Sequence, residues 1–363
     1  MNIDLQRIRF GVNYVPSKKW WYCWNDFEPD AIARDLDAIA SLGADHIRIM
    51  ILWPYFQPNR RWVSEAHLDR LDVLMRLAGE RHLDVCATML TGWLSGWAFR
   101  PTFDRPGDFY TAHEMREPIE LYFRRCAERL NGHPHFLGFD LGNEMNYCWK
   151  TENLDDGDEW MSRMFDLCES ISPEGVHLNG VDHNPWFHPH TFSPAGLARR
   201  QKLIALHCWI GFTGATERGG PLDPVCTKLA PAMAALARTY AGDTQKPVWL
   251  QEFGASSHWM DAQQIPKFLE AATHAAIAGG IGWLTWWASH DILAKYQFDA
   301  MEYDLGLITT ENKIKPAGGV FQRLAREFGG RPVAIPVLPV KPLPAHAAES
   351  TWSWLEEIQR ELP

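Results

Sequence analysis

The stretch 136-FLGFDLGNEMN-146 contains an apolar run that ends in a glycine, an asparagine and a glutamate. A second stretch, 246-KPVWLQEFG-254, has the same form, because its apolar run also ends in a glutamate. Each pattern is typical of a short buried β-strand that presents an acidic side chain at its carboxyl end. In a closed parallel barrel, all strand ends of one polarity meet on one rim. We therefore expect the carboxylates of Glu144 and Glu252 to face each other there.

One pattern recurs eight times along most of the chain: a short apolar segment of strand type, then a longer segment with helical spacing. This repetition predicts a single-domain (β/α)8 TIM barrel, an α/β fold with a closed parallel sheet. The expected strands cover residues 8–14, 46–52, 83–90, 136–141, 175–181, 203–207, 248–251 and 281–286. The expected helices begin near Asp30 and after Ser64, a candidate N-cap, and then cover residues 114–130, 159–171, 194–200, 224–240, 266–278 and 316–328.

A doubly wound open sheet is the alternative arrangement of alternating strands and helices. It would need a glycine-rich turn after the first strand, but the residues there are 13-NYVP-16. We assign residues 1–329 to the barrel and residues 330–363 to a C-terminal extension packed on it, in which Ser350 is a candidate helix N-cap. The loops after five strands are enlarged and rich in Trp, His and acidic residues: 16–27, 91–113, 182–193, 209–223 and 288–312.

The composition narrows the classes of partner and compartment. A net charge of −10 argues against nucleic acid or an anionic membrane as a partner. No apolar run reaches the roughly 18 residues of a transmembrane helix, and the first residues show no secretion signal, so we expect a cytoplasmic protein. Seven cysteines without paired short spacing indicate free thiols rather than disulfides or a zinc site.

Two carboxyl groups on one rim fit the chemistry of glycosidic bond cleavage. That reaction needs an acid for the leaving oxygen and a second carboxylate at the anomeric carbon. The acid requires a raised pKa, whereas the second carboxylate must stay ionised and needs a nearby cation or other donors. Arg48 on the second strand is placed to supply that charge. The count of 18 tryptophans mildly favours a carbohydrate ligand, although any single Trp is more simply explained by core packing.

Two other groups of residues have side chains that could bind a metal or a sugar. The pairs His133 and His135, and His188 and His190, resemble metal ligands and would suit a metal-dependent hydrolase. Their proline-containing loops lack the i, i+4 spacing of helical ligand pairs, so we expect neither a metal nor a cofactor. The acidic residues after the eighth strand are expected to be mostly solvated, and otherwise to contact sugar hydroxyls or a partner subunit: Asp291, Asp299, Glu302 and Asp304.

Over residues 8–328 the chain resembles the retaining glycoside hydrolases of clan A, and most closely family 5. The resemblance rests on Asn-Glu at the end of the fourth strand, Glu at the end of the seventh and Arg on the second. It implies that Glu144 is the acid/base and Asn143 its neighbour that binds the sugar 2-hydroxyl. It implies that Glu252 is the nucleophile and that Arg48 and His207 belong to the site. The sugar platform on the eighth strand matches Trp286, with the adjacent Trp287 as the alternative.

The chain departs from the usual family pattern at two places. On the sixth strand the family has His, one residue, then Tyr, where this chain has His207, Cys208 and Trp209. Only the indole nitrogen of Trp209 is then available to support the nucleophile. After the third strand, many cellulase-like members carry His, but this chain reads 89-MLTGW-93, which places Trp93 there and resembles the mannan-acting members. The opening 11-GVNYVPSKKWWYCWND-26 is similar to the intracellular exo-β-mannosidases of the family.

These observations predict a retaining β-glycoside hydrolase, most simply an exo-acting β-mannosidase with a small oligosaccharide as substrate. An endo-β-1,4-mannanase or endoglucanase is the alternative. A non-catalytic sugar-binding barrel and a metal-dependent hydrolase are less favoured, because both glutamates are present. The sequence carries no signal for an oligomeric state.

Overall fold

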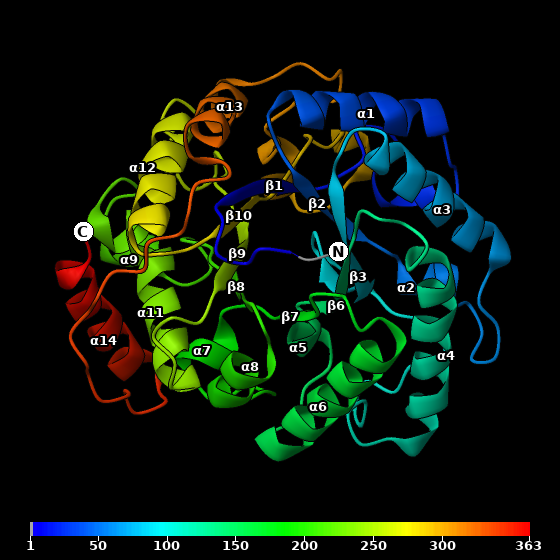
Figure 1. Cartoon of the computed structure of the whole chain (residues 1–363), viewed down its shortest axis with the longest axis horizontal. Helices are drawn as coiled ribbons and strands as arrows, with labels where there is room; N and C mark the ends of the chain where they lie inside the picture. The colour runs from blue at the N-terminus through cyan, green and yellow to red at the C-terminus, as the bar shows by residue number, and fades with distance from the viewer. Residues whose placement is uncertain (1–2) are drawn as a thin grey trace.

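Eight parallel strands form the central sheet, in the order β7-β6-β3-β2-β1-β10-β9-β8. The computed structural model describes residues 3–363, so residues 1–2 of the predicted barrel segment lie outside the described part. Figure 1 shows the strands at the centre of the molecule and the long helices in a ring around them. The (β/α)8 barrel is confirmed. Its strands are β1 (Arg9–Asn13), β2 (His46–Met50), β3 (Asp84–Leu90), β6 (Phe136–Asn143), β7 (Leu178–Gly180), β8 (Ile204–His207), β9 (Val248–Phe253) and β10 (Trp283–Trp286).

One long helix follows each barrel strand and covers the outside of the sheet. These helices are α1 (Pro29–Ser41), α3 (Glu65–Gly79), α4 (His113–Leu130), α6 (Leu154–Ile171), α8 (Pro194–Arg200), α11 (Leu229–Ala241), α12 (Ile265–Ala278) and α13 (Pro316–Phe328). The helix expected over residues 224–240 is divided into α10 (Pro224–Thr227) and α11. Pro231 explains the break, because its ring would clash with the carbonyl of Thr227 in a continuous helix.

Short elements lie in the loops between the long ones. An antiparallel hairpin of β4 (Gly92–Leu94) and β5 (Trp97–Phe99) follows β3. Short helical turns follow β1, β2, β6, β7, β8 and β10. They are η1 (Trp20–Trp24), α2 (Trp53–Phe56), α5 (Met145–Cys148), α7 (Asn184–Phe187), α9 (Ala215–Arg218), η2 (Ala294–Tyr296) and η3 (Ala300–Asp304). Most of these elements follow the carboxyl ends of barrel strands, which is the end where barrel enzymes carry their sites.

The lower part of the barrel interior is filled by apolar side chains, and the upper part is polar. Strand alternation directs every second residue inward. The apolar layer consists of Cys86, Leu137, Val176, Leu178, Leu203, Ala205, Trp249 and Trp283. Toward the carboxyl ends, the fully buried side chains of Arg48, Asp140 and Gln251 replace it. Buried charges need partners, so this polar layer must be fully hydrogen-bonded to be stable.

The C-terminal extension packs on the barrel through α14 (Ala348–Glu361), which lies beside α11. Its buried face includes Trp354, Leu355 and Ile358. The expectation that Ser350 caps this helix is wrong, because the helix begins two residues earlier and the Ser350 hydroxyl donates to the Ala347 carbonyl at 2.8 Å. Ser64 does occupy the N-cap position of α3, but its hydroxyl bonds His67 Nδ1 at 2.8 Å instead of a backbone amide.

Within residues 3–363, no helix is both long enough and apolar enough to pass through a lipid bilayer.

The barrel closes between β7 and β8 without a regular backbone ladder. A buried side chain, Gln201, bridges this seam: its Oε1 accepts from the backbone amides of Asn179 at 3.0 Å and Ala205 at 3.4 Å. Its Nε2 donates to the Leu197 carbonyl at 3.1 Å. One side-chain amide therefore replaces part of the missing ladder.

We predict that Gln201→Leu lowers the free energy of unfolding by about 2–4 kcal/mol, because each buried amide left without a partner costs about 1–3 kcal/mol. Urea denaturation followed by circular dichroism measures the change. The matched control is Gln245→Leu, because Gln245 is exposed. Equal midpoints for the two variants would show that Gln201 does not hold the seam.

Candidate active site

A pocket of about 460 Å³ opens at the carboxyl ends of the barrel strands. This volume lies within the range of about 300–1,000 Å³ found for small-molecule sites. The lining combines the two predicted carboxylates with aromatic and polar side chains, as in a carbohydrate site. The lining residues are Trp93, Ser95, Gly96, Asn143, Glu144, Tyr147, Asp182, His183, Asn184, Trp209, Phe212, Glu252, Trp287, Asp299, Met301 and Glu302.

Shifts in strand pairing at the ends of two strands place the two carboxylates in this pocket. The pairing of β6 with β7 shifts register between Asp140 and Asn143, and Glu144 then adopts a left-handed backbone with φ of 45°. The pairing of β8 with β9 also shifts, from Leu206 opposite Leu250 to His207 opposite Glu252. A bulge can direct toward the site a side chain that strict alternation would direct away from it. Both glutamates therefore reach the pocket.

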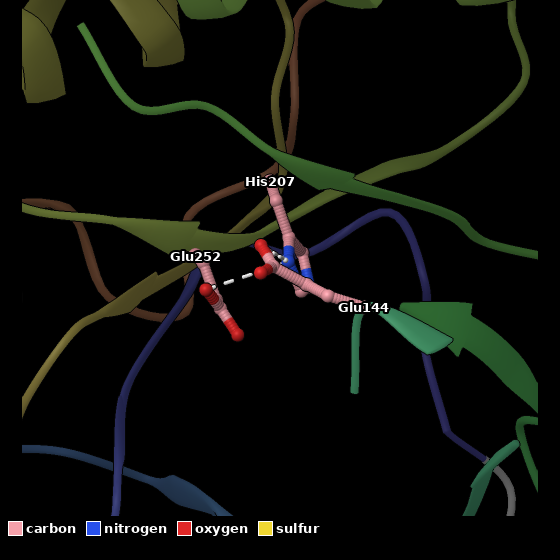
Figure 2. A group of neighbouring side chains, drawn as sticks. All are labelled: Glu144, His207 and Glu252. Atoms are coloured by element: carbon pink, nitrogen blue, oxygen red, sulfur yellow. Dashed lines mark hydrogen bonds and ion pairs between the residues drawn. The ribbon is translucent and has the colours of Figure 1, made fainter. Parts of the chain in front are cut away.

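The two carboxylates meet at His207 (Figure 2). The His207 Nδ1 atom lies 3.0 Å from Oε1 of Glu144 and 3.4 Å from Oε2 of Glu252. One oxygen of each carboxylate and a ring nitrogen of His207 all lie within 4.8 Å of one another. Glycosidases that retain configuration have carboxyl groups about 5–5.5 Å apart, and inverting ones about 6.5–9.5 Å. The observed closeness favours the retaining arrangement.

Arg48 organises the floor of the pocket. All five of its N–H groups donate hydrogen bonds within the barrel. Nη1 donates to Glu252 Oε1 at 2.6 Å and to Asn13 Oδ1 at 3.1 Å. Nη2 donates to Asn143 Oδ1 at 2.8 Å and to Asp140 Oδ2 at 2.7 Å, and Nε also donates to Asp140 Oδ2. The guanidinium therefore fixes Glu252 and Asn143 relative to each other.

Asp140 forms a second ion pair with Arg48, at 2.7 Å, and was not among the site residues predicted from the sequence. It also accepts from the Thr88 hydroxyl at 3.0 Å and from the backbone amide of Gly180 at 2.8 Å. A Cβ on Gly180 would lie 2.9 Å from Arg48 Nη2 and 2.6 Å from Gln251 Oε1, so only glycine leaves room there. The signal was present in the sequence, since an acid in the middle of a buried apolar strand requires a cationic partner.

The hydrogen-bond chain around His207 assigns its proton. Gln251 Nε2 donates to Asp140, so its Oε1 accepts from His207 Nε2 at 3.0 Å. Burial lowers the pKa of His207, and the neutral ring then has its lone pair on Nδ1. Burial, together with nearby Asp182, raises the pKa of Glu144 to about 8. A protonated Glu144 that donates to Nδ1 is consistent with all of these contacts.

Glu252 has the surroundings of an ionised carboxylate. Burial raises its pKa, and the adjacent Arg48 guanidinium opposes this rise. Besides the Arg48 contact, its Oε2 accepts from the indole nitrogen of Trp209 at 3.2 Å. The side chain of Glu252 is 4% exposed, against 16% for Glu144. The site thus holds one carboxyl group that favours its proton and one that is bound directly to a cation.

The remaining predicted residues lie around this pair, with one exception. Asn143 and Trp93 line the pocket, and the Asn143 side chain donates to the Trp93 carbonyl at 2.6 Å. The Trp93 ring packs against Tyr147 with 4.7 Å between ring centroids. Together with Trp209, these residues give the pocket its aromatic walls.

The expectation that Trp286 lines the site is corrected, because Trp287 lines it instead. On β10 the residues that face the barrel interior are Trp283 and Thr285, so alternation directs Trp286 outward. There its indole nitrogen donates to the Leu305 carbonyl at 3.0 Å. Two tryptophans are adjacent in the sequence, and the inward register of the strand decides which of them lines the pocket.

The acidic loop after β10 is more buried than expected. Glu302 is buried in the pocket wall and accepts hydrogen bonds from Trp287 and Ser95. Asp291 is paired with Lys315 at 2.6 Å. The expectation of a mainly solvated loop is therefore wrong for these two residues. Loop contacts between distant segments leave no periodic signal in the sequence, which explains the miss.

The two histidine pairs do not form a metal site. His133 bonds Asp72 at 2.7 Å, whereas His135 bonds Asp84 at 2.9 Å, so the two rings have separate partners. His188 bonds Asn184 at 3.0 Å, and His190 lies against Asn146. Among residues 3–363, the group with metal-ligand spacing is Glu144, His207 and Glu252. The Arg48 guanidinium bound to Glu252 opposes a second cation there.

Comparison with known proteins places these features in a family. No family model matches the sequence, and a search of curated proteins found no match. Among solved structures, a GH5_18 protein from Streptomyces cattleya in complex with GlcNAc is 33% identical with a TM-score of 0.90, covering 98% of this chain and 91% of that chain. A variant of that protein in complex with Manβ1-4GlcNAc is 32% identical, also with a TM-score of 0.90, covering 97% and 91%.

An exo-β-1,4-mannosidase from Opitutaceae bacterium strain TAV5 is 26% identical with a TM-score of 0.78, covering 91% of this chain and 63% of that chain. The likeness to the Streptomyces protein extends over nearly the whole of both chains, so it includes the barrel, the pocket loops and the C-terminal helix. The chain belongs to glycoside hydrolase family 5 and is a glycosidase.

Proposed function

We propose that the protein is a retaining, exo-acting β-mannosidase that removes a terminal β-mannosyl unit from a short oligosaccharide such as Manβ1-4GlcNAc. The observation that carries the proposal is the convergence of Glu144 and Glu252 on His207 beside Arg48. The sugars bound by the Streptomyces protein, and the activity in the name of the Opitutaceae enzyme, support the choice of substrate. The enclosing loops around the pocket support exo action.

In the first step, Glu252 attacks the anomeric carbon and forms a glycosyl ester, while Glu144 gives its proton to the departing glycosidic oxygen. Arg48 and Trp209 hold the attacking carboxylate through its two oxygens. His207 bonds Glu144 through Nδ1 and keeps the acid in position. The charge that Glu252 loses on forming the ester leaves Arg48 paired with Asp140.

In the second step, water replaces the leaving group. Glu144, now ionised, takes a proton from this water as the oxygen attacks the anomeric carbon and displaces Glu252. Two inversions give a product of the starting configuration. The proton of Glu144 and the charge of Glu252 are both restored. Asn143, held by Arg48 and by the Trp93 carbonyl, is placed to donate to the hydroxyl next to the anomeric carbon.

We predict that kcat/KM on Manβ1-4GlcNAc falls as the pH rises through about 8, because Glu144 must be protonated and its pKa is raised to about 8. Below that pH the acid is present, and above it the rate drops about tenfold per pH unit. The pH–rate profile measures this limb. In Glu144→Gln the limb should disappear and the rate should fall by about 10²–10⁴-fold. An unchanged alkaline limb in that variant would contradict the assignment of the acid.

We predict that Glu252→Ala abolishes turnover of an aryl β-mannoside and that added azide restores it with an α-configured mannosyl azide as product. Azide takes the place of the missing nucleophile and attacks once, with inversion. Nuclear magnetic resonance identifies the anomer. The matched control is Glu144→Ala with azide, which should give the β-azide because Glu252 still forms the ester. A fully active Glu252→Ala enzyme, or a β-azide from it, would refute the nucleophile.

We predict that β-1,4-mannotriose with a labelled reducing end loses mannose one unit at a time from the other end. An enclosed pocket accepts a chain terminus but not the middle of a polymer. Product lengths over time, and the viscosity of mannan, measure the mode of cleavage. Internal cuts with a fall in viscosity would instead support the endo-mannanase alternative, and preference for cello-oligomers would support an endoglucanase.

A further inference from the structure

Glu302 is a buried carboxyl group in the pocket wall that the mechanism above does not use. It lies on η3, and its Oε2 accepts from the indole nitrogen of Trp287 at 3.1 Å and from the Ser95 hydroxyl at 3.2 Å. Trp287 follows β10, whereas Ser95 is at the turn between β4 and β5. The carboxyl group therefore joins two loops that are far apart in the sequence and fixes the edge of the Trp287 ring.

The second oxygen of Glu302 is available to a ligand. Across residues 3–363, both hydrogen bonds of the carboxyl group use Oε2, and the residue lines the pocket. Burial raises the pKa of Glu302 to about 8. A purely structural acceptor for two neutral donors would need only an amide, which has no cost of burying an ionisable group. A buried carboxyl group with a free oxygen in a pocket is a candidate for ligand contact.

The position of Glu302 identifies which part of the substrate it would meet. It accepts from the indole of Trp287, whose backbone amide donates at 2.9 Å to the carbonyl of Phe253, the residue after Glu252. Asp182 instead accepts from the side chain of Asn146, two residues after Glu144. Glu302 is therefore on the nucleophile side of the pocket, and Asp182 is on the side of the acid and the leaving group. A sugar ring stacked on the face of Trp287 would direct its hydroxyls outward past the edge of the indole. Glu302 lies at that edge, where it accepts from the indole nitrogen.

We propose that Glu302 is a specificity-determining residue that hydrogen-bonds a hydroxyl of the terminal sugar through Oε1. Its bond to Ser95 closes this end of the pocket against a longer chain. The inference rests on the proposed β-mannosidase activity and identifies the side chain that recognises a hydroxyl of the terminal sugar. It differs from a positioning role, in which Glu302 would only orient Trp287 and would be indifferent to individual hydroxyls.

The test is a cycle between a protein change and a substrate change. Wild type, Glu302→Ala and Glu302→Ser are assayed on an aryl β-mannoside and on its 3-, 4- and 6-deoxy analogues. One deletion should cost the wild type about 10- to 100-fold in kcat/KM, as expected for a hydrogen bond to an ionisable group. The same deletion should cost the variants less than about threefold. The intrinsic reactivity of each analogue affects the wild type and the variants equally, so it cancels when their penalties are compared.

Glu311→Ala is the matched control, because Glu311 is an exposed carboxylate in the same connection between β10 and α13. This variant should show the same kcat/KM penalties as the wild type on the three deoxy analogues. Circular dichroism and the melting temperature verify folding of each variant. Equal penalties in wild type and folded variants would overturn the proposal and leave a positioning role.

If neither variant folds, the wild type alone still tests the proposal. It is overturned if no hydroxyl deletion lowers the kcat/KM of the wild type by more than about threefold. A wild type inactive on the parent mannoside would overturn the proposed function and this inference with it, whereas an active wild type without coupling would overturn the inference alone.

Discussion

The arrangement of the site depends on one buried guanidinium whose donors are all occupied. Arg48 has five N–H groups, and Asp140, Asn13, Asn143 and Glu252 accept from them inside the barrel. A buried ion is tolerated only with complete partners, and removal of one partner costs about 3–5 kcal/mol. The polar layer above the apolar floor is therefore a unit in which each member is held by the others. Glu252 belongs to this unit, which explains how a carboxylate can stay ionised with its side chain almost fully buried.

The contrast between the two carboxyl groups follows from this unit. Glu252 is bound directly to Arg48, whereas Glu144 contacts neutral His207 and lies near the negative charge of Asp182. Two carboxyl groups in different surroundings can serve as an acid and a nucleophile at the same pH. The strand irregularities matter here, because regular alternation would have separated the pair. Trp209 occupies the position where the family pattern usually has tyrosine, and its indole donates to Glu252.

Much of the fold and the centre of the site could be predicted from the sequence, because both follow from strand periodicity and strand ends. Glu144, Glu252 and Arg48 stand at positions that a parallel barrel must bring together. The choice between Trp286 and Trp287 required the inward register of β10, which two adjacent tryptophans do not reveal. Glu302 was named as part of an acidic loop, but its burial could not be predicted because it depends on contact with Ser95, which lies 207 residues earlier in the chain. The closure of the barrel by Gln201 likewise has no periodic signal.

We infer that the Arg48 unit makes Glu252 the nucleophile and leaves Glu144 as the acid. Trapping the glycosyl-enzyme tests it most directly. The protein is inactivated with 2-deoxy-2-fluoro-β-mannosyl fluoride, whose fluorine slows hydrolysis of the ester, and the labelled peptide is sequenced by mass spectrometry. We expect one sugar per chain, attached to Glu252 within the peptide that contains residues 246–254. A label on Glu144, or inactivation without any covalent sugar, would contradict the division of roles.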